Sequence, residues 1–126
     1  MASSLRITQN LGPHCIANLT LDYFPVFLKL DNSPCLVVGG GDIAARKIDL
    51  LLRARAQITV IAPHLGPKVQ TLLGQGQVRN IKAHFMSDFL ENMQLVIAAT
   101  DNRETNRHVA KVARIQCLPV NVVDQP

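Results

Sequence analysis

The segment from residue 36 to residue 52, LVVGGGDIAARKIDLLL, joins a short apolar run to a helical pattern through three consecutive glycines. Gly39, Gly41 and Ala44 fill a G-x-G-x-x-A frame directly after a strand pattern and at the start of a helix pattern, as a dinucleotide-binding turn requires. Glycines there allow a tight turn and let the backbone approach a pyrophosphate at the helix amino terminus. The alternative is a glycine turn without a ligand, because short glycine patterns also arise by chance.

Strand-like and helix-like segments alternate over most of the chain. We expect strands at 35–38, 58–62, 78–83, 95–100 and 118–123, with helices at 42–53, 67–73 and 104–115 and a helical turn at 88–92. This alternation predicts an α/β fold, a Rossmann-like, doubly wound parallel sheet of about five strands in the order 3-2-1-4-5 with helices on both faces.

In such a sheet, ligands bind beyond the carboxyl ends of the strands where the strand order reverses, here between the first and fourth strands. The first strand leads into Gly39, Gly40 and Gly41, and the fourth leads into Thr100 and Asp101. We expect these two loops to line one cofactor crevice. Thr100 and Asp101 have the alternative of capping the following helix, which is the more frequent role of such residues.

Two further places near the crevice concern the cofactor: Asp42 after the glycines, and the end of the second strand. Asp42 follows the glycines and is expected to cap the helix, with its backbone near the cofactor. The second strand ends at Ala62, Pro63 and His64, where an acid usually holds the ribose 2′-hydroxyl of NAD. No arginine follows that strand directly, so NADP is not favoured either, and ribose contact would come from the backbone or from His64.

Composition limits the class of partner. The formal net charge of +4 comes from scattered basic residues, which favours a small polyanionic ligand over nucleic acid. The three cysteines form no CxxC pair, no apolar run reaches the length of a membrane span, and no signal peptide is evident, so we expect a cytoplasmic protein without membrane attachment. Cys35 and Cys117 are expected to be buried, and the four histidines share no ligand spacing, so no resident metal is expected.

The two ends of the chain differ in pattern. Residues 1–20 contain no acid and no clear period, and we interpret them as a disordered extension preceding a single domain at 21–126. Near the other end, Asp124 follows the last expected strand in PVNVVDQP. A carboxylate at the carboxyl edge of the sheet is well placed to act as a general base, and capping a turn is the alternative.

Five segments together carry a resemblance. In order and spacing, LDYFPVFLKL, CLVVGGGDIAARKIDLLLRA, ITVIAP, LVIAATDNRETN and PVNVVDQP resemble the amino-terminal domain of siroheme synthase, the precorrin-2 dehydrogenase and sirohydrochlorin ferrochelatase family, over residues 21–126. The resemblance implies oxidation of precorrin-2 to sirohydrochlorin with NAD as cofactor. In many members the insertion of ferrous iron, as a substrate, follows.

The resemblance also implies residue roles. By position, Asp42, Ile43, Pro63 and His64 match the family's NAD contacts. Asp124 matches the carboxylate that would take a proton during dehydrogenation and help to remove pyrrole protons during iron insertion. The tetrapyrroles precorrin-2 and sirohydrochlorin would then be the partners. A truncated module that binds NAD or a tetrapyrrole without turnover remains the alternative.

The chain departs from the family pattern at four places, and the first is Leu21, which stands where the family tends to have methionine. Arg55 stands after the first helix where the family usually has glycine, and the segment RIQCLPVN likewise lacks a glycine before the last strand. A non-glycine residue in a left-handed cap would cost roughly 1 kcal/mol at each position. The family is homodimeric and continues beyond the equivalent of Pro126 into a helical, dimer-forming region, so we interpret 21–126 as incomplete relative to the family.

Overall fold

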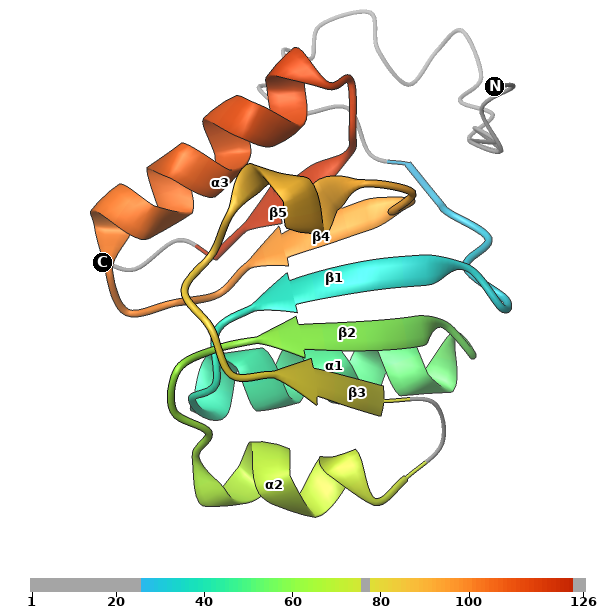
Figure 1. The fold of residues 1–126 in the computed structure, drawn as a ribbon. Helices are drawn as coiled ribbons and strands as arrows, with labels where there is room; N and C mark the ends of the chain where they lie inside the picture. Colours follow the sequence, from blue (N-terminus) through green and yellow to red (C-terminus); the bar gives the residue numbers. More distant parts are fainter. Residues whose placement is uncertain (1–25, 76–77, 124–126) are drawn as a thin grey trace, which may run out of the picture.

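The computed structural model describes residues 26–75 and 78–123. These residues form one five-stranded sheet in the order β3-β2-β1-β4-β5, with all four strand pairings parallel (Figure 1). The elements are β1 (Pro34–Val38), α1 (Asp42–Arg53), β2 (Gln57–Ile61), α2 (Pro67–Leu73), β3 (Val78–Ile81), the 3-10 helix η1 (Ser87–Leu90), β4 (Leu95–Ala98), α3 (Arg103–Ile115) and β5 (Val120–Val122). The predicted fold class and strand order are confirmed.

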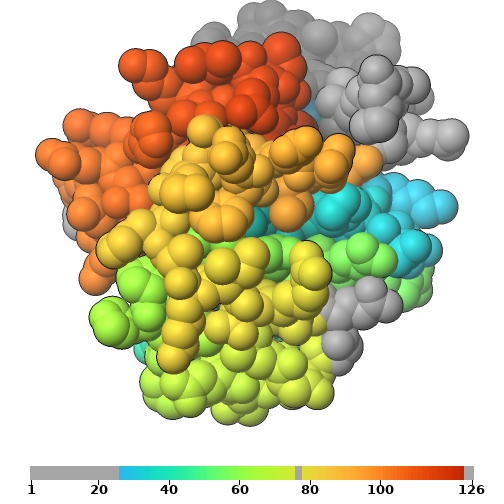
Figure 2. Space-filling view, in the orientation of Figure 1, coloured from blue at the N-terminus to red at the C-terminus, as the bar shows by residue number. Residues whose placement is uncertain are grey.

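Apolar side chains of the central strands are buried on both faces of the sheet, as parallel strands require. Along β1, Cys35 and Val37 pack into the cluster beneath α1 and α2, whereas Leu36 and Val38 pack into the cluster beneath α3 and η1. Burying a side chain of this size contributes roughly 1.5–3 kcal/mol. The segment between β3 and β4 covers the front face of the sheet in Figure 2, where it is drawn in yellow and gold.

Helices α1 and α3 both end in the same hydrogen-bonded turn, with a non-glycine residue in a left-handed conformation. After α1, Arg55 has φ 61°, and the N–H of Ala56 donates to the carbonyl of Leu51 at 3.1 Å. After α3, Cys117 has φ 55°. Both are the positions at which the sequence lacks the expected glycine, and this turn normally favours glycine because it has no Cβ. The left-handed site predicted at Arg55 is therefore confirmed, and the second, expected within RIQCLPVN, is Cys117.

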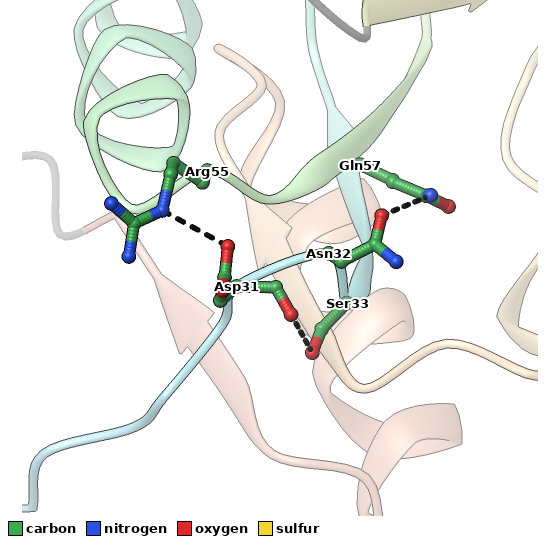
Figure 3. Close-up of polar contacts among 5 residues, drawn as sticks. All are labelled: Asp31, Asn32, Ser33, Arg55 and Gln57. Atoms are coloured by element: carbon green, nitrogen blue, oxygen red, sulfur yellow. Dashed lines mark hydrogen bonds and ion pairs between the residues drawn. The ribbon is translucent and has the colours of Figure 1, made fainter.

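Backbone and side-chain bonds tie the turn before β1 to the turn before β2 at the amino edge of the sheet, and Figure 3 shows the side-chain bonds. The backbone N–H of Asn32 donates to the carbonyl of Arg55 at 2.8 Å, and Asn32 itself has φ 58°. Side chains add two bonds: Arg55 Nε donates to Asp31 Oδ1 at 3.0 Å, and Gln57 Nε2 donates to Asn32 Oδ1 at 2.6 Å. Two left-handed residues are thus held against each other.

Several expectations differ in detail from the structure. The third and fourth strands end at Ile81 and Ala98, two residues earlier than expected, because the chain turns away from the sheet there to form loops. Cys35 is buried, but Cys117 is exposed, because it lies in the turn after α3. The expected disordered segment 1–20 lies outside the described residues. Within the described ranges, no helix is long and apolar enough to cross a membrane.

Candidate functional site

Gly39 is required at the end of β1 by its conformation and by its neighbour. Its φ is 135°, which L side chains rarely adopt. A Cβ at this position would overlap the carbonyl oxygen of Ala99 and lie 2.7 Å from the carbonyl carbon of the same residue. The exits of β1 and β4 therefore approach each other closely only because residue 39 is glycine.

Gly40 packs against the loop that follows β2. A Cβ on Gly40 would overlap the carbonyl oxygen of His64 and lie 3.1 Å from the Cβ of Ala62. The N–H of Gly66 also donates to the carbonyl of Gly40 at 2.8 Å. The glycine turn and the β2–α2 loop are thus in direct backbone contact.

Gly41 differs from its two neighbours because nothing lies within 4 Å of a Cβ built on it. It precedes α1 with φ −92° and ψ −165°, and α1 has no side-chain capping bond within the part of the chain that the structure describes. The N–H groups of the first turn of α1 therefore have no side-chain acceptor among the described residues, and the space beside Gly41 is open. Such a helix start is a favourable place for an anion, because unpaired N–H groups and the helix dipole both attract negative charge.

The predicted cap at Asp42 is wrong. Asp42 is the first residue of α1, one position after the capping position, so its side chain does not reach back to the free N–H groups. Its carboxylate lies instead 3.6 Å from Lys68 Nζ on α2. Both side chains are about two-thirds exposed, so this pair contributes little to stability.

A cavity of about 700 Å³ opens at the carboxyl edge of the sheet, bordered by the loops after β1, β2, β3 and β4. All nine residues predicted to contact the cofactor line it: Gly39, Gly40, Gly41, Asp42, Ile43, Pro63, His64, Thr100 and Asp101. A cavity of this size lies within the usual range for small-molecule and cofactor sites. The crevice between the first and fourth strands lies where strand order predicted it, whereas NAD contact by these residues stays a prediction.

The cavity has a further wall that the sequence did not reveal. Ala83, His84 and Phe85, from the loop after β3, line it together with Asn102 and Thr105 at the start of α3. The ring of Phe85 meets that of His108 on α3 edge to face, with centroids 5.6 Å apart. The loop after β3 has no periodic pattern, so only its position after a strand could have indicated this role.

Helix α3 is capped by Asn102 rather than by Thr100 or Asp101. Asn102 Oδ1 accepts from the N–H groups of Glu104 at 2.9 Å and Thr105 at 3.2 Å. Thr100 lines the cavity and is hydrogen-bonded to Asn106, a buried residue of α3. A sign of this contact was present in the sequence: Asn106 interrupts the apolar stripe of α3 that continues at Val109.

Two other kinds of reactive group were candidates: the Cys35 thiol and clusters of metal-ligating side chains. Burial raises the pKa of the Cys35 thiol to about 11, so this thiol is neutral at physiological pH and is a poor nucleophile. In the described residues, no cluster of three or more His, Cys, Asp or Glu side chains is arranged to hold a metal ion.

Asp124, the predicted general base, lies outside the described residues. Its neighbour Val123 is described, and the N–H of Val123 donates to the carbonyl of Ala98 at 2.9 Å. Ala98 ends β4 and is followed by Ala99, which lines the cavity. Val123, the last residue before Asp124, therefore lies beside the end of β4, at the edge of the sheet that borders the cavity.

Comparison with known proteins agrees with this geometry. Residues 26–126 match a family described as putative NAD(P)-binding. The siroheme synthase of Nitrosomonas europaea is 50% identical over 107 residues, and that of Thioalkalivibrio sulfidiphilus is 44% identical over 106 residues. Each alignment covers 84% of this chain and 22% of the relative, so the chain spans less than a quarter of the length of these relatives.

A solved structure resembles the fold closely. The structure of SirC, precorrin-2 dehydrogenase, matches with a TM-score of 0.71 and 32% sequence identity. The match covers 82% of this chain and 51% of the SirC chain. The resemblance inferred from the five segments is confirmed, and the chain belongs to the putative NAD(P)-binding family as a homologue of the amino-terminal region of siroheme synthases.

Proposed function

We propose that this domain binds NAD in the cavity at the carboxyl edge of its sheet and serves the oxidation of precorrin-2 to sirohydrochlorin in siroheme biosynthesis. The observation that carries the proposal is the open space at Gly41 beside the uncapped start of α1. Gly39 and Gly40 are needed for packing within the protein, whereas Gly41 has no such internal reason to be glycine. A pyrophosphate approaching the helix amino terminus supplies that reason.

The relatives support the choice of reaction. SirC is named a precorrin-2 dehydrogenase, and the relatives in sequence are named siroheme synthases. The basic net charge of +4 also suits a substrate with several carboxylates. The domain would therefore meet precorrin-2 at the mouth of the cavity that holds the cofactor.

The exit of β2 favours NAD over NADP. Pro63 and His64 line the cavity there, and neither an acid nor an arginine occupies these positions. An arginine commonly accommodates the additional 2′-phosphate of NADP. Lys68, a nearby cation on α2, already pairs with Asp42. We therefore assign ribose contact to the backbone of this loop and to His64.

The proposed reaction removes one hydride and one proton from the tetrapyrrole. NAD, when bound, supplies the hydride acceptor. Asp124 takes the proton as general base, and the bond between Val123 and Ala98 supports this role because it brings the preceding residue to the edge that borders the cavity. The same carboxylate would accept pyrrole protons when ferrous iron, as substrate, enters sirohydrochlorin.

Cofactor binding is tested with two matched glycine substitutions. Gly41→Ala places a methyl group in the proposed pyrophosphate path, while Gly74→Ala places one at the end of α2, where the nearest other atom is 4.0 Å away. Calorimetric titration should show NAD affinity lowered about tenfold or more by Gly41→Ala, equivalent to roughly 1.4 kcal/mol, with Gly74→Ala near the parent value. Equal affinity in all three proteins would contradict the assigned pyrophosphate position.

Turnover is tested anaerobically by following the absorbance of sirohydrochlorin with precorrin-2 and NAD as substrates. Asp124→Asn should abolish turnover while leaving NAD affinity unchanged. Full turnover in Asp124→Asn would remove the general-base role. NAD binding without turnover in the parent chain would reduce the proposal to a cofactor-binding module, the alternative that the sequence left open.

A further inference from the structure

Asn106 is a polar residue in an apolar position. It lies on the inner face of α3, where it is only 3% exposed, and the same face carries Val109, Ala110 and Ala113. An amide in such surroundings is destabilising unless its donor and acceptor are both hydrogen-bonded. The partners of Asn106 therefore indicate what the residue is for.

The described hydrogen bonds of the Asn106 side chain converge on a single residue, Thr100. Its Oδ1 accepts from the backbone N–H of Thr100 at 3.1 Å and lies 2.6 Å from Thr100 Oγ1. Its Nδ2 donates to the backbone carbonyl of Thr100 at 3.0 Å. The amide thus holds both backbone groups of Thr100 at once, which fixes the orientation of that residue as it leaves the sheet.

Thr100 in turn contacts the cap of α3 and lies close to the glycine turn. Its Oγ1 accepts from the N–H of Asn102 at 3.2 Å, and Asn102 is the cap of α3. On the other side, the N atom of Thr100 would lie only 3.2 Å from a Cβ on Gly39. Thr100 therefore faces the glycine turn directly, and Thr100 and Gly39 both line the cavity.

We infer that Asn106 is a positioning residue for the cofactor site. It does not itself line the cavity, but it holds residues 100–102 as a wall at a fixed separation from the glycine turn. The identity of the bound cofactor rests on the proposed function. The fixing of the wall by the amide does not, because it is a property of the protein without ligand.

A crossed pair of variants separates the hydrogen bonds from the packing. Asn106→Leu keeps the approximate volume of the side chain and removes the bonds to Thr100. Val109→Ala removes volume from the same buried face of α3, where Val109 is fully buried, and leaves those bonds intact. Asn106→Ala takes the place of the leucine variant if that variant does not fold, as judged by circular dichroism.

The first measurement is NAD affinity at a temperature where all variants are folded. Asn106→Leu should weaken NAD binding about tenfold, the equivalent of losing one or two hydrogen bonds, and Val109→Ala should change it less than about twofold. Equal weakening by both variants would mean that Asn106 acts only through stability, and it would overturn the inference. So would unchanged binding in Asn106→Leu.

The second measurement needs no cofactor and thereby distinguishes failure of this inference from failure of the proposed function. Amide hydrogen exchange in the ligand-free protein should speed up about tenfold or more at Asn102 N–H in Asn106→Leu, although Asn106 does not touch that group, and stay unchanged in Val109→Ala. Unchanged exchange at Asn102 would overturn the inference whether or not NAD binds. If the parent protein binds no nicotinamide nucleotide but exchange at Asn102 is still faster in Asn106→Leu than in the parent, the cofactor is refuted and the positioned wall is retained.

Discussion

The turns at the amino edge of the sheet and the glycine turn at its carboxyl edge are held to their neighbouring loops by different kinds of contact. At the amino edge, Asn32 and Arg55 are non-glycine residues with positive φ, and side-chain bonds to Gln57 and Asp31 hold them. At the carboxyl edge, Gly39 and Gly40 bring loops so close that a Cβ would overlap backbone atoms. At the amino edge, side chains therefore help to hold the two turns together. At the glycine turn, where the proposed ligand would approach the backbone, the loops are in direct backbone contact.

The largest expected effect comes from breaking the carboxyl edge with Gly39→Ala. The methyl group would overlap the carbonyl oxygen of Ala99 while holding residue 39 at φ 135°. We expect the free energy of unfolding to fall by roughly 3 kcal/mol, from backbone strain and overpacking together. Urea denaturation measures this, with Gly41→Ala as the control that should stay within about 0.5 kcal/mol of the parent. Equal losses would mean that the tight approach is not what requires glycine.

Asn102→Ala should have an intermediate effect at the same edge. It removes the side-chain oxygen that accepts from Glu104 N–H and Thr105 N–H. Loss of such a cap lowers the free energy of unfolding by about 1 kcal/mol. Thermal unfolding compares it with Asn102→Ser, which retains an oxygen acceptor and should recover most of the loss. If serine is as harmful as alanine, capping is not the role of this side chain.

Arg55→Gly tests the amino edge and should be stabilising. Glycine relieves the left-handed strain of roughly 1 kcal/mol, while the lost exposed ion pair with Asp31 offsets less than half of it. The expected net gain is about 0.5 kcal/mol, read from the denaturation midpoint. Asp31→Ala isolates the ion-pair contribution because it leaves Arg55 in place. A destabilised Arg55→Gly would show that the side-chain bonds outweigh the strain.

The smallest effect at neutral pH concerns Cys35 at the start of β1. Burial raises its pKa from 9.0 to about 11, so between these values the folded protein keeps a proton that the unfolded chain releases. Stability contributed by the neutral thiol is therefore lost as the pH rises through this range. The melting temperature of the parent should fall relative to that of Cys35→Ala as the pH rises from 9 to 11. A constant difference would contradict the raised pKa.

The sequence was sufficient for the fold because strand and helix periods alternate clearly, and strand order in such folds follows from right-handed crossovers. It also located the glycine turn and the left-handed cap at Arg55, and it indicated a second such cap within RIQCLPVN, which the structure places at Cys117. It assigned the caps of α1 and α3 wrongly or left them open. Several residues with suitable oxygens are adjacent there, and the choice among them depends on where each helix begins.

Contacts between distant segments could not be derived from local pattern. The clamp between Asn106 and Thr100 joins residues on a helix and a loop, and its geometry depends on how α3 lies over the sheet. The wall formed by His84 and Phe85 depends on where an aperiodic loop runs after β3. Both are consequences of tertiary packing, and the only trace in the sequence is a polar residue, Asn106, within the apolar stripe of α3.

The hydrogen bond from Gly66 to Gly40 has a consequence for how quickly a ligand can be taken up. It fastens the β2–α2 loop to the glycine turn in the ligand-free protein, so these two walls need not find each other when a ligand arrives. Binding then requires little loss of chain entropy at this side of the cavity. Association of an anionic ligand here should accordingly be governed by diffusion and charge rather than by the slow closing of a loop.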